Sequence, residues 1–140
     1  MAVRRSDKIA ALEKLPLFAG LSQNELKRVS RLTEEIQVPA GHRIVTTGET
    51  GRELFIIADG RARITTRRGG SVHLGPGDYF GEMSVIDGEP RSANVEALTP
   101  MRLLVVGYRE FWQLLDEHLP IVRKIVRTLA RRLREAERSL

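Results

Sequence analysis

Residues 53–80 read ELFIIADGRARITTRRGGSVHLGPGDYF, and this stretch decides the fold. It contains three short runs rich in Val, Ile and Thr, which are residue types that favour β-strands, and glycines separate the runs. Glycine adopts the backbone angles that tight turns require. The stretch therefore predicts short β-strands joined by hairpin and corner turns.

The same pattern continues on both sides of this stretch. Further runs are EIQV, HRIVTT, ANVEAL and MRLLVV, at residues 35–38, 42–47, 93–98 and 101–106. A series of about seven or eight short strands broken by glycine indicates a β-sandwich or barrel. We therefore expect a mainly β fold across residues 34–107.

Helical patterns precede the strands. Ser22 and Glu25 form the Ser-x-x-Glu signature of a capping box, and apolar residues at helical spacing follow. Residues 7–15 read as another short helix. The segment PLFAG at residues 16–20 reads as a turn that places its Leu and Phe on the core, so residues 1–33 form the N-terminal helical part.

Helical spacing returns after the strands, in residues 108–140. Pro120 divides this part into two helices and suits the first turn of the second one. In that last helix one apolar stripe faces away from most of the arginines; it consists of Val122, Ile125, Val126, Leu129 and Leu133.

Length and composition narrow the possibilities. A chain of 140 residues is expected to form one domain, spanning residues 1–140. The chain has no cysteine, which excludes disulfide scaffolds and thiolate chemistry. No apolar run approaches the roughly 18 to 20 residues that a membrane-spanning helix needs. We therefore expect a soluble, cytoplasmic protein.

The net charge of +5 arises entirely from one segment. Residues 121–140 carry seven basic and two acidic side chains, so the preceding residues sum to zero. The basic character therefore describes the last helix and not the surface of the β region.

The longest break in the strand region reads FGEMSVIDGEPRSA, at residues 80–93. A short helix that starts after Gly81 would present unpaired backbone N–H groups to an anion. Arg91 offers a permanently charged fork for phosphate oxygens, and Ser92 adds a hydroxyl. The Glu82 carboxylate would repel an anion, so it suits this site only if it accepts a hydrogen bond from a hydroxyl group of the same ligand. A phosphate next to a ribose hydroxyl meets both demands.

The stretch GPGDYFGEMSVIDGEPRSANV, at residues 75–95, resembles the cyclic nucleotide-binding domains of protein kinase A, catabolite activator proteins and cyclic-nucleotide-gated channels. That family has a phosphate-binding cassette, here residues 80–93. The matching positions are Phe80, Gly81, Glu82, Pro90, Arg91, Ser92 and Ala93. The resemblance implies an antiparallel jelly-roll, the β-roll, with helices at both ends, and it implies a sensor and no enzyme.

Carried onto this sequence, the resemblance implies that Glu82 accepts the ribose 2′-hydroxyl and that Arg91 pairs with the cyclic phosphate. Backbone N–H groups would line the phosphate at Gly81, Met83, Ser84 and Ser92.

Two further parts of the site follow from the same resemblance. Val72 and Leu74 would form an apolar wall for the purine, although apolar alternation alone fits two core residues equally well. The last helix would cap the base through Leu133 or its neighbours Ala130 and Arg134. Because Ser92 stands where cyclic GMP readers of the family often have threonine, we favour cyclic AMP over cyclic GMP.

Other functions are weighed against this one. His42, His73 and His118 stand singly, so we expect no metal site, which a cupin-like enzyme would need. Ser84 is not in a Gly-x-Ser-x-Gly motif, and no catalytic residue is predicted. A transcription-factor sensor without its helix-turn-helix stays an alternative, with specific DNA binding not expected from this chain. Three interpretations of the last helix stay open: its basic face is simply solvated, its apolar stripe forms a homodimer contact, or the helix contacts nucleic acid or an anionic membrane.

Overall fold

The computed structural model describes the backbone of residues 5–138 and the side chains of residues 8–138. Its strands form two antiparallel sheets of four strands each. The first sheet has the order β1 (Glu34–Val38), β8 (Met101–Val106), β3 (Leu54–Asp59), β6 (Tyr79–Phe80). The second has the order β2 (Arg43–Val45), β7 (Ala93–Ala97), β4 (Ala62–Thr66), β5 (Ser71–Leu74).

This architecture confirms the predicted mainly β fold. Each of the seven strand-like runs of the sequence contains a strand, and glycines with positive φ lie at several of the turns, such as Gly60 at +96° between β3 and β4. The strand β6 was not predicted, because two residues are too short to show an alternating pattern. It forms because Tyr79 and Phe80 pair with Ile56 and Phe55 of β3.

The strand β3 separates two apolar cores. Leu54 and Ile56 belong to the core under the helices, whereas Phe55 and Ile57 belong to the core between the sheets. Successive side chains of a strand point to opposite faces, so a strand buried on both faces is apolar throughout. This burial explains why residues 54–57 show no polar alternation.

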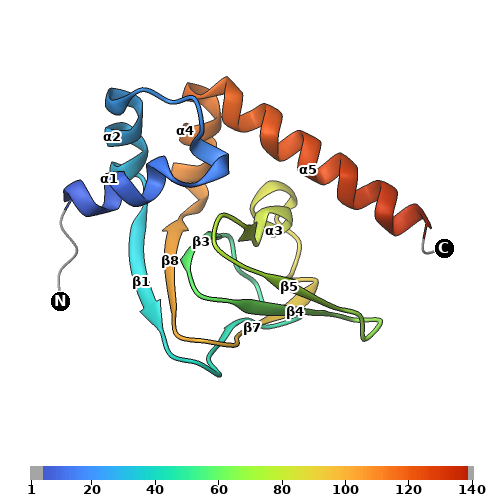
Figure 1. Ribbon diagram of the computed structural model, residues 1–140. Coiled ribbons are helices and arrows are strands. Elements are labelled where there is room, and N and C mark those ends of the chain that lie inside the picture. Colours follow the sequence, from blue (N-terminus) through green and yellow to red (C-terminus); the bar gives the residue numbers. More distant parts are fainter. Residues whose placement is uncertain (1–4, 139–140) are drawn as a thin grey trace.

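The helices gather over one core. They are α1 (Arg5–Glu13), the 3-10 turn η1 (Pro16–Phe18), α2 (Gln23–Arg31), α4 (Tyr108–Glu117) and α5 (Leu119–Arg138). Leu17 and Phe18 are buried as predicted, and Pro120 lies in the first turn of α5. Figure 1 shows α1, α2 and α4 together, with α5 running from them across α3 (Glu82–Asp87). No helix in the described part of the chain has the length and apolarity to cross a membrane.

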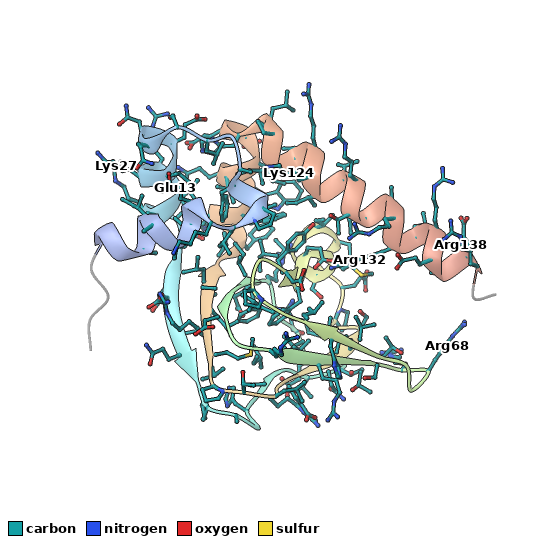
Figure 2. The ribbon with its side chains drawn as sticks, viewed as in Figure 1. Glu13, Lys27, Arg68, Lys124, Arg132 and Arg138 are labelled. Atoms are coloured by element: carbon teal, nitrogen blue, oxygen red, sulfur yellow. The ribbon has the colours of Figure 1, made fainter. Side chains whose placement is uncertain are left out.

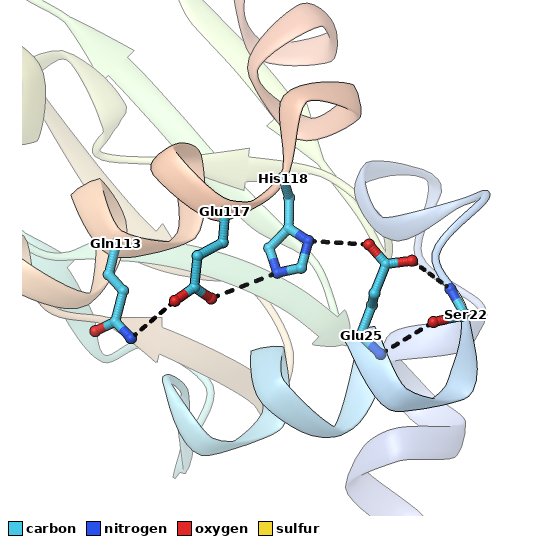
Figure 3. Close-up of polar contacts among 5 residues, drawn as sticks. All are labelled: Ser22, Glu25, Gln113, Glu117 and His118. Carbon is cyan, nitrogen blue, oxygen red and sulfur yellow. Dashed lines mark hydrogen bonds and ion pairs between the residues drawn. The ribbon is translucent and has the colours of Figure 1, made fainter.

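The N-terminal helices and the C-terminal helices meet at His118. The side chains of Ser22 and Glu25 form the predicted capping box of α2. The Glu25 carboxylate also lies 3.3 Å from Nδ1 of His118, which is buried between α4 and α5, and Nε2 of that ring lies 3.9 Å from Glu117 (Figure 3). His118 therefore ties the junction of α4 and α5 to α2.

The apolar stripe predicted for the last helix divides into two faces. Ile125 is buried in the core under the helices and Leu129 packs against it, whereas Val126 and Leu133 are 57% and 62% exposed. A helix turns 100° per residue, so residues that share a broad stripe in the sequence need not share a contact. Val126 and Leu133 are therefore left largely uncovered by the described residues.

Candidate functional site

A cavity of about 420 Å³ lies between the second sheet, α3 and α5. Strands β2, β4, β5 and β7 supply its apolar walls, through Val45, Ile64, Val72, Leu74 and Val95. The loop and helix that follow β6 supply the polar side. Two other cavities, of about 320 and 510 Å³, lie beside η1, and neither is lined by Glu82 or Arg91.

Gly81 shapes the start of the predicted cassette. Its φ of +91° belongs to the left-handed region, and a Cβ at this position would stand 2.7 Å from the Glu53 carbonyl oxygen and 2.8 Å from Nη1 of Arg91. Only glycine satisfies both conditions without moving its neighbours. The helix α3 begins directly after it, as the sequence predicted.

Arg91 is buried at the polar side of the cavity. Its Nη1 donates to the Gly81 carbonyl oxygen and its Nη2 donates to the Glu53 carbonyl oxygen, both at 3.0 Å. The Glu53 carboxylate lies 3.9 Å from Nη2, and the guanidinium lies 5.9 Å from the Phe55 ring centre. Main-chain bonds to Gly48 and Glu49 hold the backbone of Arg91. Hydrogen bonds within the protein therefore fix the position of the guanidinium group.

Burial is the main influence on the charge of Arg91. Desolvation lowers the pKa of the Arg91 guanidinium, while Glu53 and Glu82 oppose this change and raise it. A cation that has lost water but not been fully neutralised attracts an anion more strongly than an exposed one does.

Glu82 is 2% exposed and lines the same cavity. Its Oε1 accepts from Nη1 of Arg132, a residue of α5, and Arg132 also reaches the Tyr79 carbonyl oxygen through Nη2 at 3.5 Å. Figure 2 shows Arg132 extending from α5 toward α3. The carboxylate that the sequence assigned to a ribose hydroxyl is therefore held by a cation from the last helix.

The structure brings nearly all predicted site residues to this cavity. The lining residues among them are Gly81, Glu82, Met83, Ser84, Arg91, Ser92, Ala93, Val72 and Leu74. Val72 is 53% exposed although it is apolar, so it lies on the wall of the cavity and outside the core. Leu74 is 8% exposed and belongs to the core between the sheets, although it also lines the cavity.

Leu133 is the exception. It is 62% exposed and does not line the cavity, and neither Ala130 nor Arg134 does. The residues of α5 that reach the cavity are Arg131, Arg132 and Glu135. Helical rotation is the reason, because Arg132 points to Glu82 and its sequence neighbour Leu133 is turned by about 100°. The base cap expected at Leu133 is therefore not formed in this arrangement of α5.

Sequence reasoning also missed part of the walls. Ile64 pairs with Val72 of β5 and with Val95 of β7, so these side chains lie side by side on one face of the sheet. The alternation in ARITTR carries this signal, but it becomes specific only once the strand register is known. The described residues contain no group of three or more His, Asp or Glu side chains that could hold a metal ion.

Known proteins match this chain over most of its length. A family model described as "Cyclic nucleotide-binding domain" matches residues 35–118 of the chain. A cyclic nucleotide-gated potassium channel of Mesorhizobium japonicum is 37% identical over 140 residues, which cover 98% of this chain and 39% of the channel. The cyclic AMP receptor protein of Thermus thermophilus is 37% identical over 131 residues, which cover 89% of this chain and 60% of that protein.

Solved structures show the same fold. The Thermus thermophilus catabolite activator protein superposes with a TM-score of 0.79 at 32% identity, over 89% of this chain and 61% of that one. The regulatory domain of Toxoplasma gondii PKA, crystallised with cAMP, superposes with a TM-score of 0.80 at 26% identity, over 91% of this chain and 50% of that one. The chain thus spans less than two thirds of the length of each of these relatives.

Proposed function

We propose that this chain, which belongs to the cyclic nucleotide-binding domain family, is a regulatory sensor that binds a 3′,5′-cyclic nucleotide and prefers cyclic AMP to cyclic GMP. We propose further that it works as one domain, residues 1–140, in which helices before residue 34 and after residue 107 flank the β-roll. The relatives named above are a channel, a receptor and the regulatory domain of a PKA, which favours a sensor over a catalyst.

One observation carries the proposal: a buried arginine and a buried glutamate line one cavity with apolar walls. Arg91 would pair with the cyclic phosphate, because its fork is preorganised by two carbonyl oxygens and keeps a positive charge. Glu82 would accept the ribose 2′-hydroxyl. Val72 and Leu74 would pack against the base.

The last helix supports a signalling role. Arg132 of α5 holds Glu82 in the present arrangement, so a ribose hydroxyl that binds Glu82 competes with this ion pair. Nucleotide binding would thereby change the free energy of docking α5 on the cavity. Such a change shifts the equilibrium between two positions of α5, and the size of the shift is limited by how much the nucleotide affinity differs between those positions.

The preference for cyclic AMP rests on Ser92, which lines the cavity. A serine hydroxyl can both donate and accept a hydrogen bond and can serve either base, and the preference follows from the threonine that the family's cyclic GMP readers often carry at this position. The receptor of Thermus thermophilus, whose name states that it responds to cyclic AMP, is 37% identical to this chain.

Titration calorimetry of cyclic AMP and cyclic GMP into nucleotide-free protein tests the proposal. We expect saturable binding of both, with cyclic AMP tighter. A charge-assisted hydrogen bond is worth roughly 1.5–3 kcal/mol, so Arg91→Ala is expected to weaken binding by about tenfold to a few hundredfold. Arg68→Ala is the control, since Arg68 is exposed at the turn between β4 and β5 and does not line the cavity. Unchanged affinity in Arg91→Ala would remove Arg91 from the site.

A further inference from the structure

A cavity of about 320 Å³ lies between η1, the turn before β6 and the middle of α5, and is termed the η1 cavity. This volume falls at the lower end of the roughly 300–1,000 Å³ that small-molecule sites occupy. Part of its wall is apolar and consists of Pro16, Leu17 and Pro76. The nucleotide site described above lies in a different cavity and gives the η1 cavity no role.

Positive charge dominates the wall of the η1 cavity. Among the described residues that line it, Asp78 supplies the only carboxylate, and this carboxylate already accepts a hydrogen bond from the Gly75 main-chain N–H at 2.8 Å. Four basic side chains of α5 line the same cavity: Lys124, Arg127, Arg131 and Arg132. A hollow lined mainly by one sign of charge concentrates ions of the opposite sign.

Arg127 and Arg131 are the two cations that a ligand would engage first. They lie four residues apart on α5 and therefore share one face of the helix, where like charges repel each other. Both are exposed, and they take part in none of the ion pairs that join described residues. An anion between them replaces repulsion by attraction to both, and a guanidinium fork fits the oxygen pairs of a phosphate.

Lys124 fixes α5 against η1. Its ammonium group donates to three main-chain carbonyl oxygens at 2.9, 3.4 and 2.8 Å, those of Pro16, Leu17 and Ala19. Figure 2 shows Lys124 and Arg132 along the same helix. Lys124 therefore holds one wall of the η1 cavity in place and adds positive charge, while its hydrogen bonds remain within the protein.

A hydrogen-bond donor is also available beside this cavity. Tyr79 lines it and is 7% exposed, and its hydroxyl oxygen has no hydrogen-bond partner of ordinary geometry among the described residues. Buried polar groups without a partner are rare in proteins. Burial raises the pKa of Tyr79 more than the nearby Thr128 hydroxyl lowers it, so the Tyr79 hydroxyl keeps its proton at neutral pH and can donate.

We propose that the η1 cavity is a second anion site, which binds a phosphate-bearing small molecule through Arg127 and Arg131, with the Tyr79 hydroxyl as a further donor. The apolar part of the wall would contact an organic group attached to the phosphate. This assignment depends on the charge and shape of the η1 cavity and is independent of the proposed function.

Arg132 links the two cavities. It lines both of them, and its Nη1 donates to the Glu82 carboxylate in the nucleotide cavity. An anion in the η1 cavity attracts Arg132 away from Glu82, which leaves that carboxylate open to a ribose hydroxyl. The anion and a cyclic nucleotide then raise each other's affinity by the same factor, as thermodynamic linkage requires. This link, unlike the anion site, rests on the proposed function.

Titration calorimetry with pyrophosphate at constant ionic strength tests the anion site without a ribose or a base. We expect saturable binding, which Arg127→Gln weakens by about five- to tenfold because a charge-assisted contact is lost. Arg123→Gln is the matched control, since it removes the same charge from an exposed position of the same helix and lines neither cavity. Equal weakening by both substitutions, or binding that does not saturate, overturns the proposal.

Cyclic AMP added to the same protein locates the pyrophosphate and tests the link. At a pyrophosphate concentration that saturates only the wild type, we expect cyclic AMP to bind several-fold more tightly to the wild type and with unchanged affinity to Arg127→Gln. Competition between pyrophosphate and cyclic AMP would place pyrophosphate in the nucleotide cavity and overturn the anion site.

Two further outcomes separate the parts of the proposal. If pyrophosphate binds through Arg127 and leaves the affinity for cyclic AMP unchanged, the link through Arg132 is wrong, and the anion site and the proposed function both stand. If pyrophosphate binds in this way and cyclic AMP does not bind at all, the proposed function fails and the anion site stands.

Discussion

Arg132 and Glu82 are 50 residues apart in the chain and form an ion pair on the wall of the cavity. The carboxylate is almost completely buried, and the arginine belongs to the last helix. A group that the nucleotide would use is thus bound to the element that would report occupancy. This relationship makes α5 part of the site rather than an appendage to it.

Removal of Arg132 should destabilise the nucleotide-free domain. Arg132→Ala leaves Glu82 buried without its cation, and the expected loss is about 1–2 kcal/mol, since the arginine side chain is 37% exposed and partly screened by water. Urea unfolding measures the change. Arg134→Ala, on the exposed face of the same helix, should stay within about 0.5 kcal/mol. Equal effects of the two substitutions would show that the ion pair does not stabilise the domain.

The role of Glu82 can be separated from general damage to the site by removing the ligand's hydroxyl. Glu82→Gln should weaken the binding of cyclic AMP by about tenfold, because a charge-assisted hydrogen bond is replaced by a neutral one. Its effect on 2′-deoxy cyclic AMP should be much smaller. Calorimetry with both nucleotides gives the coupling between residue and hydroxyl. If Glu82→Gln weakens the binding of both nucleotides equally, Glu82 supports the fold of the site and does not bind the ribose hydroxyl.

Gly51 keeps the space for Arg91. A Cβ at this position would stand 2.7 Å from Nε and 2.9 Å from Nη2 of Arg91, whose fork cannot shift without losing its two carbonyl acceptors. Gly51→Ala should therefore weaken the binding of cyclic AMP by about three- to tenfold. Gly75→Ala is the matched control, since a Cβ there meets nothing within 4 Å. Equal affinities of the two variants would mean that the position of Arg91 is not critical.

The capping box of α2 predicts an acid-sensitive contribution to stability. Hydrogen bonds from Ser22 lower the pKa of Glu25, desolvation opposes them by a smaller amount, and contact with His118 lowers the pKa further. A lowered carboxyl pKa stabilises the fold above the ordinary value of about 4.3, and this stabilisation is lost as the pH falls through the lower folded value. Glu25→Gln should therefore lose less stability than the wild type between about pH 5 and pH 3.

Thermal unfolding across this pH range provides the measurement. Glu89→Gln, an exposed carboxylate in the loop before Arg91, is the control and should follow the wild-type profile. A Glu25→Gln profile that parallels the wild type would show that the capping box does not respond to acid.

Local patterns were sufficient for most of the fold. Runs of β-branched residues between glycines predicted all strands except β6, and Ser22 with Glu25 predicted the start of α2. The spacing of Glu82 and Arg91 predicted two groups of opposite charge around one ligand, and the structure places both on one cavity. These features are visible in sequence because each depends on residues within about ten positions of one another.

What the sequence by itself determined was the order of strands and helices and the chemistry of residues 80–93. Only the tertiary structure decided that Arg132 and not Leu133 meets the cavity, that Val72 lies on its wall, and that Val126 and Leu133 of the apolar stripe on α5 remain largely exposed. The physical reason is that propensities and capping act between near neighbours in the chain. The rotation of α5 about its axis is instead set by how Ile121 and Ile125 pack into a core built from distant segments.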